Sequence, residues 1–81
     1  MTSRLTAIIE LGSSGIRLLV AELHCDGSWT VLDRAGRSIA LGRDVFNSGS
    51  ISRDLFFECI EGLKGFKELL EGWRIDMRDV H

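Results

Sequence analysis

The 81-residue chain has a net charge of −2, and 44% of its residues are hydrophobic and 27% charged, the balance of an ordinary globular domain or a piece of one. This charge excludes proteins that bind nucleic acid or membrane surfaces through a general excess of basic side chains, so we expect neither partner. The longest apolar runs fall far short of a membrane span, and two cysteines are too few for a disulfide scaffold, so free thiols and a cytoplasmic location are expected.

Three strands are predicted in the first half of the chain. Residues 5–10 are apolar and β-branched, and a glycine-containing turn over residues 11–15 follows them. Residues 16–23 are apolar almost throughout, which predicts a strand covered on both faces. The Asp-Gly pair in residues 24–28 predicts a hairpin turn, and residues 29–41 predict a third strand with a bulge near Ala35 and Gly36.

A loop over residues 41–49 and then one helix are predicted in the second half. Ser52 is the expected N-cap, with Ile51 and Phe56 placed as a hydrophobic staple, and Gly72 is the expected C′ residue. Three-four spacing predicts one buried face, formed by Phe56, Cys59, Ile60, Leu63, Phe66 and Leu70. Gly62 and Gly65 weaken the helix. We expect packing to hold it; the alternative is that these glycines permit a close backbone approach on that face.

Residues 74–80 predict the start of a fourth strand. The fold class is therefore α/β: a three-stranded antiparallel meander, a helix and the start of a fourth strand. This order also opens a ribonuclease-H-like domain of the actin-like ATPase superfamily, in which the fourth strand pairs parallel to the first through a right-handed crossover.

The first turn is the best candidate for a binding site. Gly12, Ser13 and Ser14 are small enough for backbone N–H groups to approach an anion, and the serines add hydroxyl donors. Glu10 precedes them, where a carboxylate could hold a divalent ion beside a phosphate. A plain hairpin turn has the same composition, so these residues alone leave both interpretations open.

A resemblance favours the phosphate site. Residues 7–21 resemble the first phosphate-binding motif of the exopolyphosphatase/guanosine pentaphosphate phosphohydrolase (Ppx/GppA) family, which usually reads Asp-Leu-Gly-Ser-Asn-Ser. Residues 32–42 resemble the third strand of that family, and residues 49–52 resemble the Gly-x-Leu-Ser lead into its first helix. The three matches occur in the same order and spacing as in the family.

The resemblance implies roles for five residues. Gly12, Ser13 and Ser14 would cradle a phosphate, Arg17 would take the Arg/His position after the loop, and Glu10 would take the position of the Asp that is associated with Mg²⁺. The substrate would be inorganic polyphosphate or guanosine pentaphosphate. Glu10, Ser14 and Gly15 replace the usual Asp, Asn and Ser, which leaves the metal geometry and the loop donors open.

The resemblance also implies that residues 1–81 form only the N-terminal part of the first phosphatase domain. The catalytic Glu of the family and its second domain would lie beyond residue 81, so we expect no catalytic residue and no hydrolysis in this segment alone. Residues 74–80 would lack their remaining sheet neighbours in such a segment, and the helix face of the sheet would be only half covered. This isolated edge predicts a homodimer or a domain-swapped oligomer.

Two other functions remain open. The chain could belong to a sugar kinase or another actin-like ATPase, or to a non-catalytic module that binds a partner at a sheet edge. Arg34, Arg37 and Arg43 are either an anion-attracting patch or plain solvated charges. Residues 24–26 (His-Cys-Asp) fit solvated turn residues better than a metal site.

Overall fold

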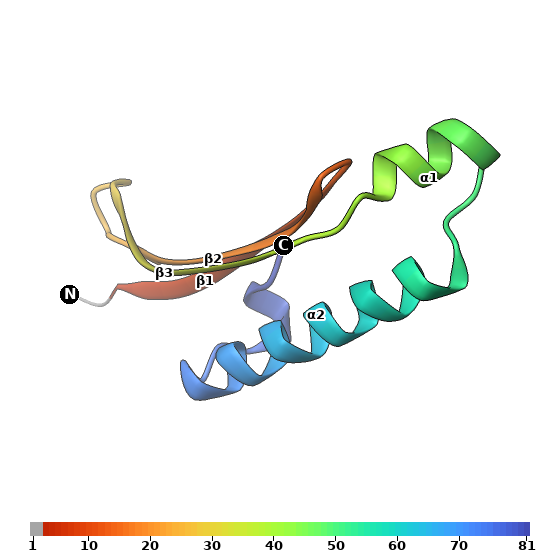
Figure 1. Ribbon diagram of the computed structural model, residues 1–81. Coiled ribbons are helices and arrows are strands. Elements are labelled where there is room, and N and C mark those ends of the chain that lie inside the picture. The colour runs from red at the N-terminus through yellow and green to blue at the C-terminus, as the bar shows by residue number, and fades with distance from the viewer. Residues whose placement is uncertain (1–2) are drawn as a thin grey trace.

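The computed structural model describes residues 3–81, except for the side chain of residue 44. The first two residues of the predicted domain segment, residues 1–81, therefore lie outside the described range. A sheet and one long helix form two layers (Figure 1). In chain order the elements are β1 (Arg4–Gly12), β2 (Gly15–Leu23), β3 (Trp29–Ser38), α1 (Leu41–Ser48), α2 (Arg53–Gly72) and the 3₁₀ helix η1 (Met77–Asp79). The predicted α/β class is confirmed.

The three strands form the predicted antiparallel meander in the order β1-β2-β3. A tight turn pairs Gly12 with Gly15, and the register continues to Arg4 opposite Leu23. Between β2 and β3 the register shifts at Val20 and Ala21, where Leu32 is the extra residue. The bulge predicted near Ala35 and Gly36 is therefore wrong, because Gly36 pairs regularly with Arg17.

The core lies between one face of the sheet and α2, which runs beneath the sheet in Figure 1. Ile16, Leu18 and Val20 alternate along β2 and are at most 2% exposed. On the opposite face, Ile8 is 48% and Trp29 58% exposed. The two-sided cover predicted for residues 16–23 is thus not found among the described residues. The sheet instead follows the period-two pattern of one buried face.

Helix α2 begins as predicted, because the Ser52 side chain accepts a hydrogen bond from the Leu55 N–H at 3.3 Å. Cys59, Phe66 and Leu70 are buried on the predicted face, whereas Phe56 is exposed. Gly62 is buried too, and a Cβ there would lie 2.4 Å from Cδ1 of Ile16. At Gly62 the structure therefore supports the less favoured alternative, in which the glycine permits close helix-to-sheet packing.

The end of α2 differs from the prediction. Trp73 is the C-cap residue, and Arg74 adopts the left-handed conformation (φ 58°) that we expected of Gly72. Hydrogen bonds from Arg74 N–H to Glu71 O and from Ile75 N–H to Leu70 O, both 3.0 Å, form a Schellman motif. The buried contact of Ile75 in the core holds this motif in place.

Residues 41–48 form helix α1, so the loop predicted over residues 41–49 is wrong. Leu41 is buried and anchors the first turn. Gly49 is left-handed (φ 75°) and its N–H donates to Val45 O at 2.8 Å, which closes the helix. The third strand accordingly ends at Ser38 rather than at residue 41.

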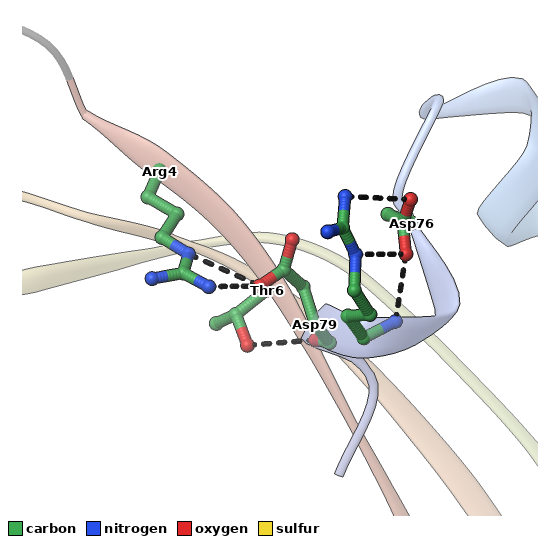
Figure 2. Close-up of polar contacts among 5 residues, drawn as sticks. Arg4, Thr6, Asp76 and Asp79 are labelled. Atoms are coloured by element: carbon green, nitrogen blue, oxygen red, sulfur yellow. Dashed lines mark hydrogen bonds and ion pairs between the residues drawn. The ribbon is translucent and has the colours of Figure 1, made fainter.

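The prediction of a strand from residue 74 is also wrong. The 3₁₀ helix η1 occupies the centre of this segment, and among residues 74–80 only Val80 forms a bridge to the sheet. Val80 forms a parallel bridge with Ala7, flanked by hydrogen bonds from Ile9 N–H to His81 O and from His81 N–H to Ala7 O. Parallel pairing with the first strand is therefore confirmed at one position. Figure 2 shows Arg4 paired with Asp79, and the Thr6 hydroxyl donating to the Asp79 carbonyl at 2.9 Å.

Within residues 3–81, no helix is both long and apolar enough to cross a membrane. Both cysteines are free as expected; Cys25 is exposed and Cys59 is buried.

Candidate phosphate-binding turn

Two backbone hydrogen bonds from later parts of the chain hold the turn between β1 and β2 in place. The carbonyl of Ser13 accepts from Gly42 N–H at 2.9 Å, and the carbonyl of Ser14 accepts from Ile39 N–H at 3.0 Å. Within the described residues, the N–H groups of Ser13 and Ser14 donate to no protein acceptor. The turn therefore keeps two backbone donors available while its acceptors are already used.

Two glycines allow the backbone around the turn to lie close to neighbouring segments. A Cβ at Gly42 would lie 2.6 Å from Cβ of Ser13, so only glycine lets the start of α1 contact the turn. At Gly15 the φ angle is 148°, and a Cβ would lie 2.2 Å from the Arg37 carbonyl oxygen. The family's usual serine would not fit at residue 15 in this arrangement, which accounts for one departure from the motif.

Glu10 and Arg17 form an ion pair beside the turn. They are opposite each other across β1 and β2, and Nη1 of Arg17 donates to Oε1 of Glu10 at 2.9 Å. Nη2 of the same guanidinium donates to the Ser14 hydroxyl at 3.4 Å. The side chains are 65% and 59% exposed, so the pair contributes at most about 1 kcal/mol to stability.

The structure thus brings the predicted site residues together. Ser13 and Ser14 line an open hollow with Ser38, Gly42, Arg43 and Phe46. A neighbouring hollow joins Ser14 and Arg17 to Arg37. Two of the three arginines considered for an anion-attracting patch, Arg37 and Arg43, therefore border the turn. The third, Arg34, lines a hollow on the outer sheet face together with Glu10 and Arg17.

The residues present do not by themselves form a metal centre. Among the side chains that the structure describes, no three of the types His, Cys, Asp and Glu gather where they could hold an ion. Glu10, the predicted metal residue, has its carboxylate bound to Arg17. Mg²⁺ therefore stays a prediction, and no chemical step at this turn is assigned to it.

The hairpin turn between β2 and β3 contains the His-Cys-Asp sequence at residues 24–26. His24 contacts the Thr30 hydroxyl at 2.8 Å, and Asp26 accepts hydrogen bonds from the Ser28 hydroxyl and N–H. These bonds from Ser28, the hydroxyl first, lower the pKa of Asp26 below its ordinary value of 3.8. The side chains therefore hold their own turn together.

The sequence analysis missed the residues that support the turn, namely Ser38, Ile39 and Gly42. They come from the end of the third strand and from α1, which we expected to be a loop. The pairing of Glu10 with Arg17 could have been found, because a two-residue turn at Ser13 and Ser14 places these residues opposite each other.

No protein-family model matches the chain, and no curated protein matches it significantly. Solved structures do match. A Ppx/GppA family member of Aquifex aeolicus is 29% identical over 93% of this chain and 24% of its own length, with a TM-score of 0.83. A structure described as the PPX-GPPA enzyme of that organism is 29% identical over 93% and 25%, with a TM-score of 0.80. The type II variant of the Ppx/GppA phosphatase of Aquifex aeolicus is 30% identical over 89% and 24%, with a TM-score of 0.78.

The chain thus spans about a quarter of the length of these relatives. The structural match covers 89–93% of its own residues, at 29–30% sequence identity. The resemblance predicted from the sequence is confirmed, and the chain corresponds to an N-terminal segment of the Ppx/GppA family.

Proposed function

We propose that this chain supplies the phosphate-binding turn of a phosphohydrolase that acts on inorganic polyphosphate or guanosine pentaphosphate. The turn residues Ser13 and Ser14 bind a terminal phosphate, and Arg17 contributes its positive charge. The attacking water and its base come from elsewhere in the complete protein, because hydrolysis needs them aligned with the phosphate.

One observation carries this proposal: the carbonyl groups of Ser13 and Ser14 accept hydrogen bonds from Gly42 and Ile39, while their N–H groups have no acceptor among the described residues. Successive backbone N–H groups and hydroxyls form concave sites for anions. An adjoining guanidinium adds charge-assisted hydrogen bonds to phosphate oxygens, which are about twice as strong as neutral ones. Similarity to a structure described as a Ppx/GppA phosphatase favours a phosphorylated ligand for such a site.

The test is phosphate release from long-chain polyphosphate and from guanosine pentaphosphate by the longest natural chain that contains these 81 residues. Ser13→Ala and Ser14→Ala remove hydroxyl donors from the turn, and Ser28→Ala removes the hydroxyl of the other hairpin turn as a matched control. We expect roughly a tenfold loss of kcat/KM in either turn variant, because a hydrogen bond to a charged group is lost, and little change in the control.

Equal activity in all four proteins would contradict the role of the turn. Release from neither substrate by the unmodified protein would remove the phosphohydrolase assignment, and the actin-like kinase and binding-module alternatives would then be examined. The preferred substrate decides between polyphosphate and the nucleotide.

A further inference from the structure

We propose that Glu10 is a positioning residue for Arg17 and does not serve as a metal ligand. This inference rests on the proposed phosphate-binding function and adds how the turn obtains its positive charge. It also assigns a purpose to a residue that departs from the usual Asp of the motif.

The strand register places the Glu10 and Arg17 side chains beside each other. Glu10 and Arg17 are directly opposed on an antiparallel pair, with their side chains on the same sheet face. The Glu10 carboxylate holds Nη1 at 2.9 Å, and this turns Nη2 towards the Ser14 hydroxyl at 3.4 Å. One carboxylate therefore fixes the direction of the guanidinium relative to the turn.

The chemistry of the two groups explains the choice of Glu. Aspartate is shorter by one methylene, about 1.5 Å, and a carboxylate there would fall short of the same guanidinium nitrogen. Arginine presents five N–H donors in one plane, so two contacts still leave donors for a phosphate oxygen. A guanidinium held in place in advance loses less conformational entropy when the anion binds.

A metal-ligand role predicts the opposite outcome for one substitution. Glu10→Asp keeps the charge and restores the residue usual in the motif. If Glu10 held a metal, this variant would keep or improve Mg²⁺-dependent binding. If Glu10 positions Arg17, the variant weakens anion binding to the same extent with and without Mg²⁺.

The experiment measures calorimetric binding of inorganic tripolyphosphate to the longest natural chain that contains these residues, in EDTA and in Mg²⁺. We expect Glu10→Asp to weaken binding roughly two- to fivefold in both conditions, the range of an exposed ion pair. The same substitution made in an Arg17→Lys background should have no further effect, because the lysine ammonium group lacks the planar fork of donors that Glu10 orients. Tighter Mg²⁺-dependent binding by Glu10→Asp, or an undiminished effect in the Arg17→Lys background, would overturn the inference.

A second readout does not need the ligand. The NMR signals of the Arg17 guanidinium hydrogens should be resolved in the unmodified protein and averaged in Glu10→Asp. Mn²⁺ added alone should not selectively broaden the amide signals of Glu10 and Leu11; selective broadening would identify a metal ligand and defeat the proposal. If the guanidinium is held but tripolyphosphate does not bind, the proposed function fails while the positioning role stands.

Discussion

Glycine occurs at residues 62 and 65 of α2 for different reasons. At Gly62 a methyl group would lie 2.4 Å from the fully buried Ile16 side chain and 3.3 Å from Cδ of Arg37. At Gly65, apart from the neighbouring backbone of α2 itself, no atom of the described residues lies within 4 Å of the same position, which borders an open groove with Leu69 and Trp73. Gly62 and Gly65 therefore allow the same substitution to be compared at a crowded and at an open position of one helix.

Gly65→Ala should stabilise the protein by up to about 1 kcal/mol, because alanine has the higher helix propensity. Gly62→Ala gains the same helix propensity but overpacks the contact with Ile16, and overpacking typically costs about 1–3 kcal/mol. Urea denaturation of both variants measures the difference in free energy of unfolding. Equal stabilities would show that α2 does not press against β2 at residue 62.

Asp76 should titrate below its ordinary pKa of 3.8, because the Arg78 side chain and then the Arg78 N–H donate hydrogen bonds to its carboxylate (Figure 2 shows Asp76). A lowered pKa means that the stabilisation is present above the pKa of the unfolded chain and is lost as the pH falls through the folded pKa. Carbon-detected NMR titration gives this value directly. Arg78→Ala should move the pKa back towards 3.8, and a value at or above 3.8 in the unmodified protein would contradict the hydrogen bonds.

At the scale of elements, the C-terminus of α2 depends on a residue that is strained by its conformation. Arg74 is left-handed, which costs a side-chain-bearing residue roughly 1–2 kcal/mol. Arg74→Gly should therefore raise the free energy of unfolding by about 1 kcal/mol, with thermal denaturation as the measurement. Lys67→Gly in the middle of the same helix is the control and should lower it by about as much. A destabilising Arg74→Gly would mean that the arginine side chain contributes more than its backbone costs.

The sequence predicted those elements whose signals are local. The two hairpins follow from Gly12 to Gly15 and from the Asp-Gly pair, and the start of α2 follows from Ser52. Helix α1 was missed because Gly42, Asn47 and Ser48 have low helix propensity. The contacts of the helix with the turn are tertiary, so no local pattern predicts them. The end of α2 was missed because Ile75, three residues beyond the expected stop at Gly72, packs into the core.

The same distinction applies to the candidate site. The turn residues were predicted from one continuous motif, and the structure places them together with Arg17. Their supports come from Ile39 and Gly42, more than twenty residues along the chain, and no local pattern connects them to the turn. The position of Glu10 beside Arg17 was implicit in the hairpin register, but the family resemblance drew attention to a metal instead.

For the whole molecule, the described chain is elongated, with extents of 51 × 22 × 18 Å. Its radius of gyration is 14.9 Å, against about 12 Å for a compact domain of this length. The start of α2 and all of α1 reach beyond the sheet in Figure 1, and Phe46, on α1, is 90% exposed. The β3 edge is less open to pairing, because it has a bulge at Leu32 and charged residues such as Arg34.

The 81-residue chain alone should therefore form a dimer or a swapped oligomer, driven by exposed apolar surface rather than by the β3 edge. Light scattering over a range of concentrations measures the mass. Phe46→Ser together with Phe57→Ser should reduce association, and Lys67→Ser, also an exposed helical position, should not. A monomeric mass at high concentration would contradict this prediction.

The central claim is that the Ser13–Ser14 turn binds phosphate. The most direct measurement is an amide NMR titration with inorganic tripolyphosphate, using the longest natural chain that contains these residues with labelled serine and glycine. We predict saturable shifts for Ser13, Ser14 and Gly15 and no comparable shifts for Gly27 and Ser28 in the other hairpin turn. Saturation without any shift at the first turn, or no binding at all, would contradict the claim and leave this hairpin as a structural turn.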